Sequence, residues 1–359
     1  MAPLRVLILT RYGPLAASAR LRFHQYLPFL ERQGFSLTVD SLLGDDYVRR
    51  LYAHQAQDRR RIIAAYGHRV STLLRAQQFD LIWLQYDLFP WAPGWWDDLL
   101  LPARVPYVLD LDDAMYHRYD LHASPFVRRV LGRKYDQLMA RSALVVAGNA
   151  AIAERASTAG APRVEIVPTV VDLDRYPLAA PSSGDSGNFV VGWIGSPATS
   201  SNLHLLRPAL EALSEIHPTT LRCVGAGKVD LGPGITVDAR PWSESSEASD
   251  IGSFDVGCMP LVDSPFERGK SGFKLIQCMA CGLPVVASPV GVNAEIVTPG
   301  ANGFLASSPE AWFEALLALA NDPGLRCEMG ANGRRKVETS YSLQMAAPIL
   351  AEALRRAAA

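Results

Sequence analysis

The chain has 359 residues, of which 49% are hydrophobic and 20% charged, and its formal net charge is −1. This composition excludes a disordered or fibrous protein and allows two domains with substantial cores. Residues 1–172 hold 21 basic and 17 acidic side chains and the remainder hold 14 and 19, a charge of about +4 against −5. We expect the more basic first half to face the more acidic partner.

The first apolar run, LRVLILT, is too short to span a membrane and lacks the cleavage site of a signal peptide. It is predicted to be a strand, and the protein to be cytosolic. The cysteines lie in apolar surroundings of the second half, at Cys223, Cys258, Cys278, Cys281 and Cys327. Cys278 and Cys281 form a CxxC motif inside a predicted helix, and without clustered histidines we favour buried small residues over a redox or zinc site. We expect no metal.

Strands and helices alternate through the first half. Strands are predicted at residues 4–9, 35–39, 79–85, 106–111, 143–147 and 164–167. The first helix is expected to begin at Ser18 as N-cap and to end at Gly34, and residues 46–77 are predicted as one basic, solvated helix. A helix capped by Asn149 is expected to reach residue 159. The β-α-β opening predicts a parallel sheet.

Residues 125–141 are predicted as a basic amphipathic helix. Its apolar side chains fall at helical spacing and five of the other positions are Lys or Arg. Such a helix can lie on an anionic membrane surface. It can equally pack its apolar stripe on the sheet and leave its arginines in water, and we favour this second interpretation.

The second half repeats the alternation after a linker. Residues 173–188 are rich in Pro, Ser, Gly and Asp, and strands follow at 189–194, 221–224, 235–237 and 254–259, with a helix from Asn202. The sequence therefore predicts an α/β protein with two tandem doubly wound parallel-sheet domains, residues 1–172 and 189–341, and a ligand cleft between the carboxyl ends of both sheets. A last helix, in residues 342–359, is expected to cross back to the first domain.

Residues 266–289 form the unit on which the functional prediction depends. A polar loop ending at Gly272 leads into an apolar-periodic helix, and Gly282 and Pro284 end that helix before a valine strand. A helix N-terminus carries unpaired N–H groups and partial positive charge, and Lys270 and Lys274 add two full charges beside it. We predict an anionic ligand here, with two solvent-exposed loop lysines as the alternative.

Several motifs carry a family resemblance. They are GxxGFKxxQxMACGLPVVAS from residue 269, VPTVVD at 167–172, WIG at 193–195 and DVGCMPL at 255–261. Together they resemble the GT-B glycosyltransferases, in particular the large family 4 of nucleotide-sugar-dependent enzymes. The resemblance covers nearly the whole chain, most strongly from about residue 143 onward. It implies a second domain that binds the nucleotide sugar and a first domain that binds the acceptor.

The resemblance also implies donor-binding residues. The family usually has one glutamate before the glycine-rich turn and a second on the following helix, where it binds the donor ribose. Here Gly269 and Gln277 stand at these positions, so both carboxylates are missing, although the Gln277 amide can still bond ribose hydroxyls. The diphosphate is expected at Lys270, Gly272, Phe273 and Lys274, where positive charge favours departure of the nucleoside diphosphate.

The first loop of the second domain often carries a basic pair in this family, and here it reads GSPATS from Gly195. Ser196 and Thr199 can bind phosphate through hydroxyl and backbone groups, or they can form a plain turn. Arg240 and Trp242 stand where the family usually holds the nucleotide base, so Trp242 can stack on the base or belong to the core.

In the first domain, Asp112 aligns with a histidine that related enzymes have near the donor sugar. A carboxylate there can act as general base toward the acceptor or can orient a sugar hydroxyl, and we predict Asp112 and Lys270 as catalytic. The DLDD run lacks a full set of ligands for a cation, and Asp113 can cap the next turn. The expected acceptor side includes basic groups able to hold a phosphorylated sugar or lipid diphosphate: Gly13, Ser18, Arg20 and Arg22.

These observations indicate a glycosyltransferase that moves a sugar from a UDP- or GDP-linked donor to a glycan or lipid-linked acceptor, in cell-surface polysaccharide or glycoconjugate synthesis. We expect no cofactor beyond the donor, no nucleic acid partner, and a cytoplasmic protein that is peripheral to the inner membrane face. Two alternatives remain open: a silent scaffold of the same fold, since both glutamates are lost, and a nucleotide-sugar epimerase.

Overall fold

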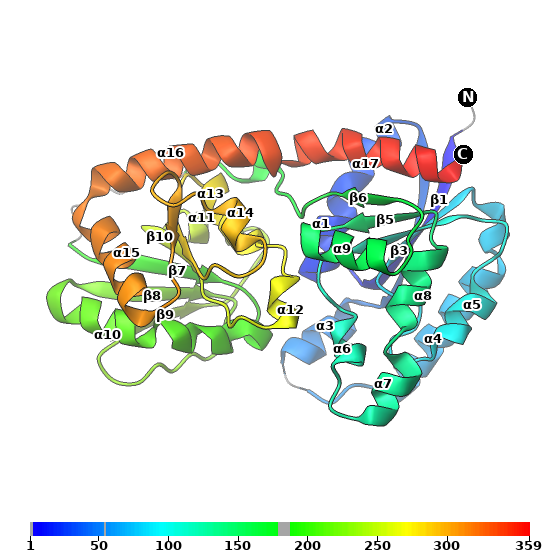
Figure 1. Cartoon of the computed structure of the whole chain (residues 1–359), viewed down its shortest axis with the longest axis horizontal. Helices are drawn as coiled ribbons and strands as arrows, with labels where there is room; N and C mark the ends of the chain where they lie inside the picture. The colour runs from blue at the N-terminus through cyan, green and yellow to red at the C-terminus, as the bar shows by residue number, and fades with distance from the viewer. Residues whose placement is uncertain (1–2, 54, 179–186) are drawn as a thin grey trace. The chain divides into compact units, whose positions relative to one another are not determined.

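The computed structural model describes residues 3–53, 55–178 and 187–359 (Figure 1). The chain divides into two compact units, and each is described by itself. The first contains Met1–Thr169, Gly269–Ser271 and Ala346–Ala359, and the second Val170–Arg268 and Gly272–Met345. Of the predicted linker, residues 179–186 lie outside the described residues.

A six-stranded parallel sheet forms the centre of the first unit. In sheet order its strands are β2 (Phe35–Leu43), β1 (Leu4–Tyr12), β3 (Leu81–Gln85), β4 (Tyr107–Leu111), β5 (Leu144–Ala147) and β6 (Val164–Ile166). Ile8 of β1 lies opposite Val39 on one side and Trp83 on the other. Every residue of β3 and β4 is buried, as expected for parallel strands covered on both faces. All six predicted strands are confirmed.

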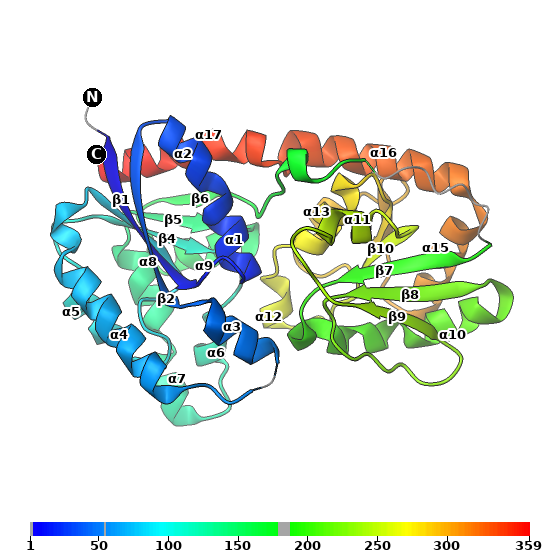
Figure 2. The ribbon, with the colours of Figure 1, turned by 180° about the vertical axis from the view of Figure 1, so that it is seen from behind.

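Helices cover both faces of this sheet. Figure 1 shows α9 in front of β5 and β6, and Figure 2, seen from behind, shows α1 and α2 on the opposite face. The helices of the unit are α1 (Ala17–Arg22), α2 (Leu27–Arg32), α3 (Asp45–Tyr52), α4 (Arg59–Leu74), α5 (Gly94–Leu100), α6 (His117–Asp120), α7 (Pro125–Leu131), α8 (Lys134–Arg141), α9 (Ala150–Thr158) and, from Ala346 onward, α17 (Leu343–Ala358). Asn149 caps α9 as predicted, since its side chain accepts from the Ile152 N–H.

The prediction of one helix from Ser18 to Gly34 is wrong. The segment forms α1, a 3-10 turn (His24–Tyr26) and then α2, which has Pro28 in its first turn. A proline cannot donate the backbone bond that would continue a helix, so it favours a new start. Because α1 begins at Ala17, Ser18 lies within its first turn and does not cap it.

Residues 46–77 and 125–141 also divide into two helices each. Asp58 separates α3 from α4 by accepting the backbone N–H groups of Arg60 and Arg61, and so starts a new helix. In α7, Phe126 is 74% exposed and Val130 is 40% exposed. The later members of the stripe, Leu131, Leu138 and Met139, are buried and the arginines are exposed, as in the interpretation we favoured, but Phe126 and Val130 depart from it.

The second unit has its own six-stranded parallel sheet. In sheet order the strands are β12 (Gly303–Leu305), β11 (Val285–Ala287), β10 (Val256–Met259), β7 (Phe189–Ile194), β8 (Thr219–Val224) and β9 (Thr236–Arg240). After β7 the chain adds β8 and β9 on one side, then returns to add β10, β11 and β12 on the other. The direction of the winding therefore reverses between β7 and β10. The predicted α/β class with two doubly wound parallel sheets is confirmed.

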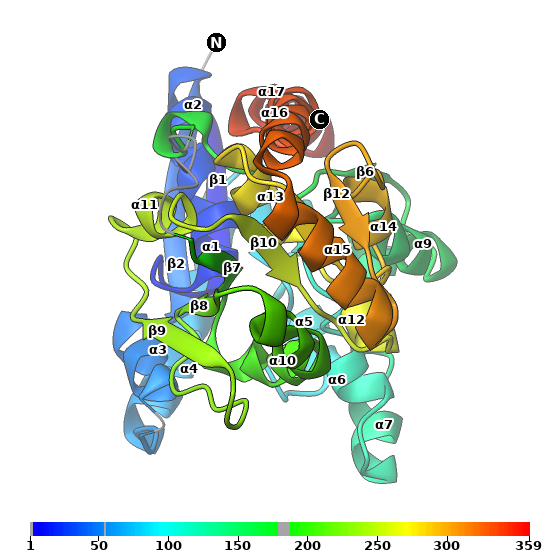
Figure 3. The ribbon, with the colours of Figure 1, turned by 90° about the vertical axis from the view of Figure 1, so that its left-hand side faces the viewer.

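Alternation along β7 divides the core of the second unit into two layers. Phe189, Val191 and Trp193 pack with α10 (Arg207–Ile216) and α15 (Pro309–Asn321), whereas Val190 and Ile194 pack with α13 (Phe273–Ala280). Figure 3 shows α10 and α15 on one side of the strands and α13 on the other. The other helices are the 3-10 helices η3 (Leu173–Arg175) and η4 (Pro197–Leu206), α11 (Glu247–Ile251), α12 (Pro265–Arg268), α14 (Asn293–Ile296) and α16 (Pro323–Ser340). The expected helix from Asn202 is thus part of η4, and α10 follows it.

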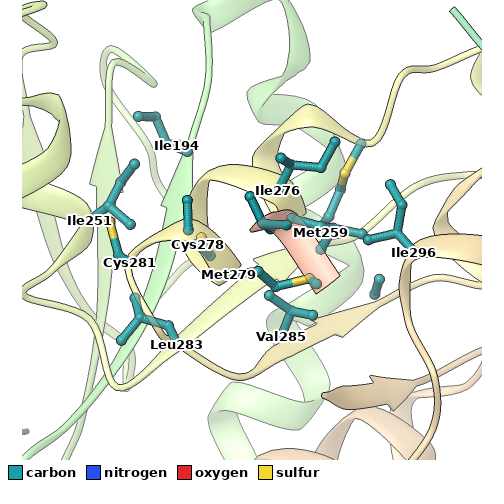
Figure 4. Packing of buried hydrophobic residues seen from close by; sticks show 14 of the residues in the cluster. Ile194, Ile251, Met259, Ile276, Cys278, Met279, Cys281, Leu283, Val285 and Ile296 are labelled. Carbon is teal, nitrogen blue, oxygen red and sulfur yellow. The ribbon is translucent and has the colours of Figure 1, made fainter. Parts of the chain in front are cut away.

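The CxxC motif lies in the layer around α13. Figure 4 shows Cys278 and Cys281 among aliphatic side chains, and both are buried. Burial raises the pKa of Cys281 to about 12 and raises that of Cys278 as well, so the thiols stay neutral. The prediction of buried small residues is confirmed. Cys327, however, is exposed, so the expectation of apolar surroundings was wrong for it.

Candidate functional site

The reversal between β7 and β10 marks where a ligand of the second unit is expected, outside the carboxyl ends of these strands. The chain leaves β7 at Gly195, and α13 begins at Phe273 after β10. Gly272, at the N-cap of α13, has a positive φ of 66° and offers no side chain to cap the helix. An anion is suited to such an uncapped first turn because the N–H groups there point outward.

Lys274 reaches toward the β7 loop from the first turn of α13. Its Nζ lies 4.4 Å from the centroid of the Trp193 ring and 3.3 Å from Thr199 Oγ1. Thr199 itself belongs to the turn at Ser196, since its backbone N–H and hydroxyl both donate to the Ser196 carbonyl. The structure therefore brings together three of the residues that the sequence predicted for phosphate binding.

Two glycines allow this close approach. A Cβ atom on Gly195 would lie 2.8 Å from Lys274 Cε and 2.6 Å from the Trp193 ring. Gly225, after β8, has a φ of 78°, and a Cβ there would lie 2.5 Å from the Gly195 carbonyl oxygen. Larger residues would displace the lysine or the loop, so glycine is required at both positions.

A buried chain of hydrogen bonds lies next to this loop. Gln277 Nε2 donates to the Tyr176 hydroxyl at 2.9 Å, the Tyr176 hydroxyl donates to Glu247 Oε1, and Trp242 Nε1 donates to Glu247 Oε2 at 2.6 Å. Gln277, Tyr176 and Glu247 are 3%, 4% and 6% exposed. Burial and the neighbouring Glu247 raise the pKa of Tyr176 well above its usual value. The predicted ribose-binding residue is thus fixed by a tyrosine and a carboxylate.

Tyr176 and Glu247 also line a cavity of about 510 Å³, together with Arg175, Glu244, Ser245 and Ala248. Arg240, predicted beside the base, instead pairs with Asp238 at 3.0 Å and with Asp250 at 3.3 Å. Its guanidinium is therefore held by protein carboxylates. Trp242 is half-buried, and its indole N–H donates to Glu247, so a base could meet this side chain only by stacking and not through the N–H.

Lys270 groups with the first unit. Its Nζ lies 3.6 Å from Asp113 Oδ2, and Asn149 Nδ2 donates to the carbonyls of Gly269 and Lys270 at 2.9 and 3.2 Å. A Cβ on Gly269 would lie 2.3 Å from the Cβ of Ala114. No side chain fits there without a shift, which is a steric reason for the glycine that replaces the family's first glutamate. Lys270 and Lys274 therefore fall in different units.

Asp112 lies at the carboxyl end of β4 and is 8% exposed. The hydroxyl of Tyr86, the residue after β3, donates to its carboxylate. Tyr86 has a φ of 62°, a conformation that is rare and costs about 1–3 kcal/mol in a non-glycine residue. Arg11 stacks over the Tyr86 ring, with its guanidinium carbon 4.8 Å from the centroid. Asp112 is thus held in one orientation by a strained neighbour.

Arg22 and Asp110 have structural roles in this arrangement. Arg22 Nε donates to Asp110 at 2.8 Å and Nη1 donates to the Val167 carbonyl at 2.6 Å, and both charged side chains are buried. Burial raises the pKa of Asp110 to about 6 despite the arginine. Two nitrogens of the Arg22 guanidinium are therefore engaged by Asp110 and by the carbonyl of residue 167, within the first unit.

The other residues predicted for the acceptor side lie in and after the loop that follows β1. Arg20 is 6% exposed, and its Nη1 donates to the Pro14 and Leu15 carbonyls at 3.3 and 3.4 Å. Asp45 Oδ1 accepts the Leu15 N–H, and a Cβ on Gly13 would lie 2.3 Å from that oxygen. The loop is thus ordered from both sides. Ser18 lies half-buried in α1 nearby.

Sequence reasoning missed three residues of the site: Tyr176, Glu247 and Tyr86. Tyr176 lies within the predicted linker, 101 positions from its partner Gln277. Glu247 precedes the buried Ile251 by four residues, so helical spacing could have placed it on the inner face of α11. Tyr86 directly follows a fully buried strand. In each case the partner is known only once distant segments are brought together.

Within residues 3–53, 55–178 and 187–359, no group of three or more His, Cys, Asp or Glu side chains is placed to hold a metal ion. No helix in the described part of the chain is both long and apolar enough to cross a bilayer.

Two family models match the chain. One described as glycosyl transferases group 1 matches residues 188–322, and one described as a glycosyl transferase 4-like domain matches residues 6–169. The chain belongs to the family 4-like, group 1 glycosyltransferases. The family resemblance inferred from the motifs is thereby confirmed.

Curated relatives of this glycosyltransferase chain carry related names. A D-inositol 3-phosphate glycosyltransferase of Xylanimonas cellulosilytica is 29% identical over 57% of this chain and 55% of its own length. A GDP-mannose-dependent monoacylated alpha-(1-6)-phosphatidylinositol monomannoside mannosyltransferase of Corynebacterium glutamicum is 25% identical over 51% of this chain and 54% of its own length. The chain spans about half the length of the curated relatives it matches.

Solved structures share the GT-B fold of this glycosyltransferase chain. Sucrose-phosphate synthase from Thermosynechococcus elongatus has a TM-score of 0.74 at 17% identity, with 98% of both chains covered. Anabaena HepE, solved in complex with UDP-glucose, has a TM-score of 0.70 at 18% identity, covering 98% of this chain and 99% of its own. At these identities the likeness establishes the fold.

Proposed function

We propose that the protein transfers a sugar from a nucleoside-diphosphate sugar to a phosphorylated glycan or lipid-linked acceptor. The observation that carries the proposal is Lys274, held by Trp193 and Thr199 beside the uncapped start of α13, at the carboxyl ends of the strands of the second unit. A lysine beside the positive end of a helix suits a diphosphate. The family and the UDP-glucose complex of HepE support a nucleotide sugar as the source of that diphosphate.

We propose that the donor needs no cofactor and that transfer depends on two groups of the first unit. Asp112 is proposed as the carboxylate that accepts the proton of the attacking hydroxyl, since Tyr86 fixes its orientation. Lys270 is proposed to leave its contact with Asp113 and to offset the negative charge on the departing diphosphate. The names of two relatives, which mention inositol 3-phosphate and a phosphatidylinositol monomannoside, support an anionic acceptor.

We also propose that α7 places the protein on an anionic lipid surface at the inner face of the membrane, as suits glycoconjugate or polysaccharide synthesis. Phe126 and Val130 are exposed beside Arg128 and Arg129, so the helix offers both apolar and cationic side chains to a bilayer.

Calorimetry and donor turnover test the proposal together. The wild-type chain should bind UDP or GDP with a measurable heat, and should release nucleoside diphosphate from a donor only when an acceptor is added. A chain that binds neither nucleotide would be a scaffold, and one that consumes donor equally without acceptor would be an epimerase or hydrolase. The family matches support neither alternative.

A further inference from the structure

The buried chain formed by Gln277, Tyr176 and Glu247 has a fixed direction. Tyr176 has one proton, and its hydroxyl donates that proton to Glu247. The same oxygen then accepts the amide N–H of Gln277. An amide can normally turn either end toward a partner, but only its nitrogen can donate to this oxygen. The carboxylate at one end of the chain therefore determines which end of Gln277 remains for a ligand.

The end that remains is the carbonyl oxygen, Oε1. Among the hydrogen bonds of the described residues, none is made to Gln277 Oε1, whereas its Nε2 is bound to Tyr176. An amide oxygen accepts hydrogen bonds and does not donate them. Gln277 is thereby made into a dedicated acceptor of hydroxyl groups, which is the property that a carboxylate at this position would supply.

Contacts between neighbours place this acceptor beside the phosphate-binding residues. Lys274 and Gln277 are three residues apart on α13, so their side chains lie on the same face of the helix. On the opposite side, Lys274 touches Gly195, and Gly195 lies against Gly225. A Cβ on Gly225 would lie 3.0 Å from Trp242 Cβ, and Trp242 donates to Glu247. Glu247 in turn accepts from Tyr176, and Tyr176 accepts from Gln277. The phosphate-binding residues and Gln277 are therefore linked by contacts within the second unit.

We propose that Glu247 and Tyr176 are positioning residues which orient Gln277 Oε1 to accept a ribose hydroxyl of the nucleotide donor. Glu247 thus stands in for the carboxylate that position 277 lacks, acting through the tyrosine. The inference rests on the proposed nucleotide-sugar function and adds to it a specific selection of ribonucleotides over 2′-deoxyribonucleotides. A site built to accept a hydroxyl proton discriminates against the analogue that lacks the hydroxyl.

Titration calorimetry of the full chain with UDP, GDP and their 2′-deoxy counterparts tests this. The wild type should bind the preferred ribonucleotide about tenfold more tightly than its deoxy form, the scale of one hydrogen bond in a buried site. Tyr176→Phe keeps the ring and removes the hydroxyl, so it should reduce this ratio to about twofold or less. Tyr176→Phe should weaken binding of the ribonucleotide and leave the affinity for the deoxy form unchanged. Tyr341→Phe, at a half-buried tyrosine of the same unit, is the matched control and should keep the full ratio.

A charge swap separates positioning from packing. Gln277→Glu alone places two carboxylates against one hydroxyl, and Glu247→Gln alone removes the acceptor that sets the direction, so each should lower the ratio. The double variant exchanges the two groups, so that the carboxylate lies at position 277 and the amide at position 247. Tyr176 can then accept from the amide and donate to the carboxylate, whose second oxygen remains for the ribose hydroxyl, and the ratio should return. Thermal unfolding confirms that each variant is folded.

The outcomes distinguish the two proposals. If the wild type binds neither UDP nor GDP, the proposed function is overturned and the inference with it. If the wild type binds them but Tyr176→Phe keeps the ribose preference, or the folded double variant does not recover it, the inference alone is overturned.

Discussion

The charge on Lys274 should govern the affinity for a diphosphate. Replacing it by methionine keeps a side chain of similar length over Trp193 and removes the charge. A unit charge about 4 Å from a phosphate is worth about 4 kcal/mol at an effective dielectric constant of about 20. Lys274 is half-buried, so desolvation and the loss of its contact to Thr199 offset part of this.

We therefore expect Lys274→Met to weaken UDP or GDP binding by about ten- to a hundredfold, or about 1.4–2.8 kcal/mol. Calorimetry with the free nucleosides uridine and guanosine provides the internal control, because a ligand without phosphate should bind wild type and variant equally. Lys228→Met, at an exposed lysine of the same unit, is the matched control protein and should behave as wild type.

Two results would refute this reasoning. Unchanged diphosphate affinity in folded Lys274→Met would show that the lysine does not contact the phosphates. An equal loss of nucleoside affinity would show that the substitution disturbs the pocket and not its charge. Raising the salt concentration should reduce the difference in diphosphate affinity between wild type and Lys274→Met, because salt screens an electrostatic contact at a partly exposed site.

Three further predictions concern the first unit. Lys270→Ala should lower turnover by at least about tenfold with the fold intact, and unchanged turnover in a folded variant would contradict its assignment. Burial raises the pKa of Asp97 from 3.8 to about 7 beside Lys134. The folded chain then holds that proton more tightly than the unfolded chain, so the free energy of unfolding in urea should fall from about pH 4 to 7, and Asp97→Asn should remove this fall. A fall of the same size in Asp97→Asn would exclude this carboxyl as its source. The wild type should co-sediment with vesicles that contain anionic lipid and should not co-sediment with neutral vesicles. A charge reversal at Arg128, Arg129 and Arg133 should abolish co-sedimentation with the anionic vesicles. Wild type that stays in the supernatant with anionic vesicles would refute the membrane proposal.

The strands were predictable because burial on both faces leaves a local signature. β3 and β4 consist of residues that are all buried, and their apolar runs are visible without knowledge of any partner. The helix capped by Asn149 was predicted with its boundaries, whereas residues 18–34, 46–77 and 125–141 were each predicted as one helix and form two. Pro28 and Asp58 each start a new helix where apolar spacing alone suggests that the helix continues. Periodicity reports which side of a helix is buried and gives little information on where backbone hydrogen bonding restarts.

The candidate site was predictable only in its local parts. Ser196, Thr199 and Lys274 lie in the first turns of the helices that follow β7 and β10, and a parallel sheet brings these strand ends together. The ion pair of Arg22 could not be predicted, because its partner Asp110 is 88 positions away and the pair is buried. The bond of Gln277 to Tyr176, 101 positions away in the predicted linker, could likewise not be predicted. Polar residues in long-range pairs carry no periodic signal that separates a structural role from a ligand-binding one.

A crystal structure of the chain soaked with UDP, GDP or a sugar-linked donor tests the central claim most directly. We expect a diphosphate at the first turn of α13, within hydrogen-bonding distance of Lys274 Nζ, and a ribose hydroxyl on Gln277 Oε1. A nucleotide bound elsewhere in the second unit, with no phosphate oxygen within hydrogen-bonding distance of Lys274 Nζ, would contradict this expectation.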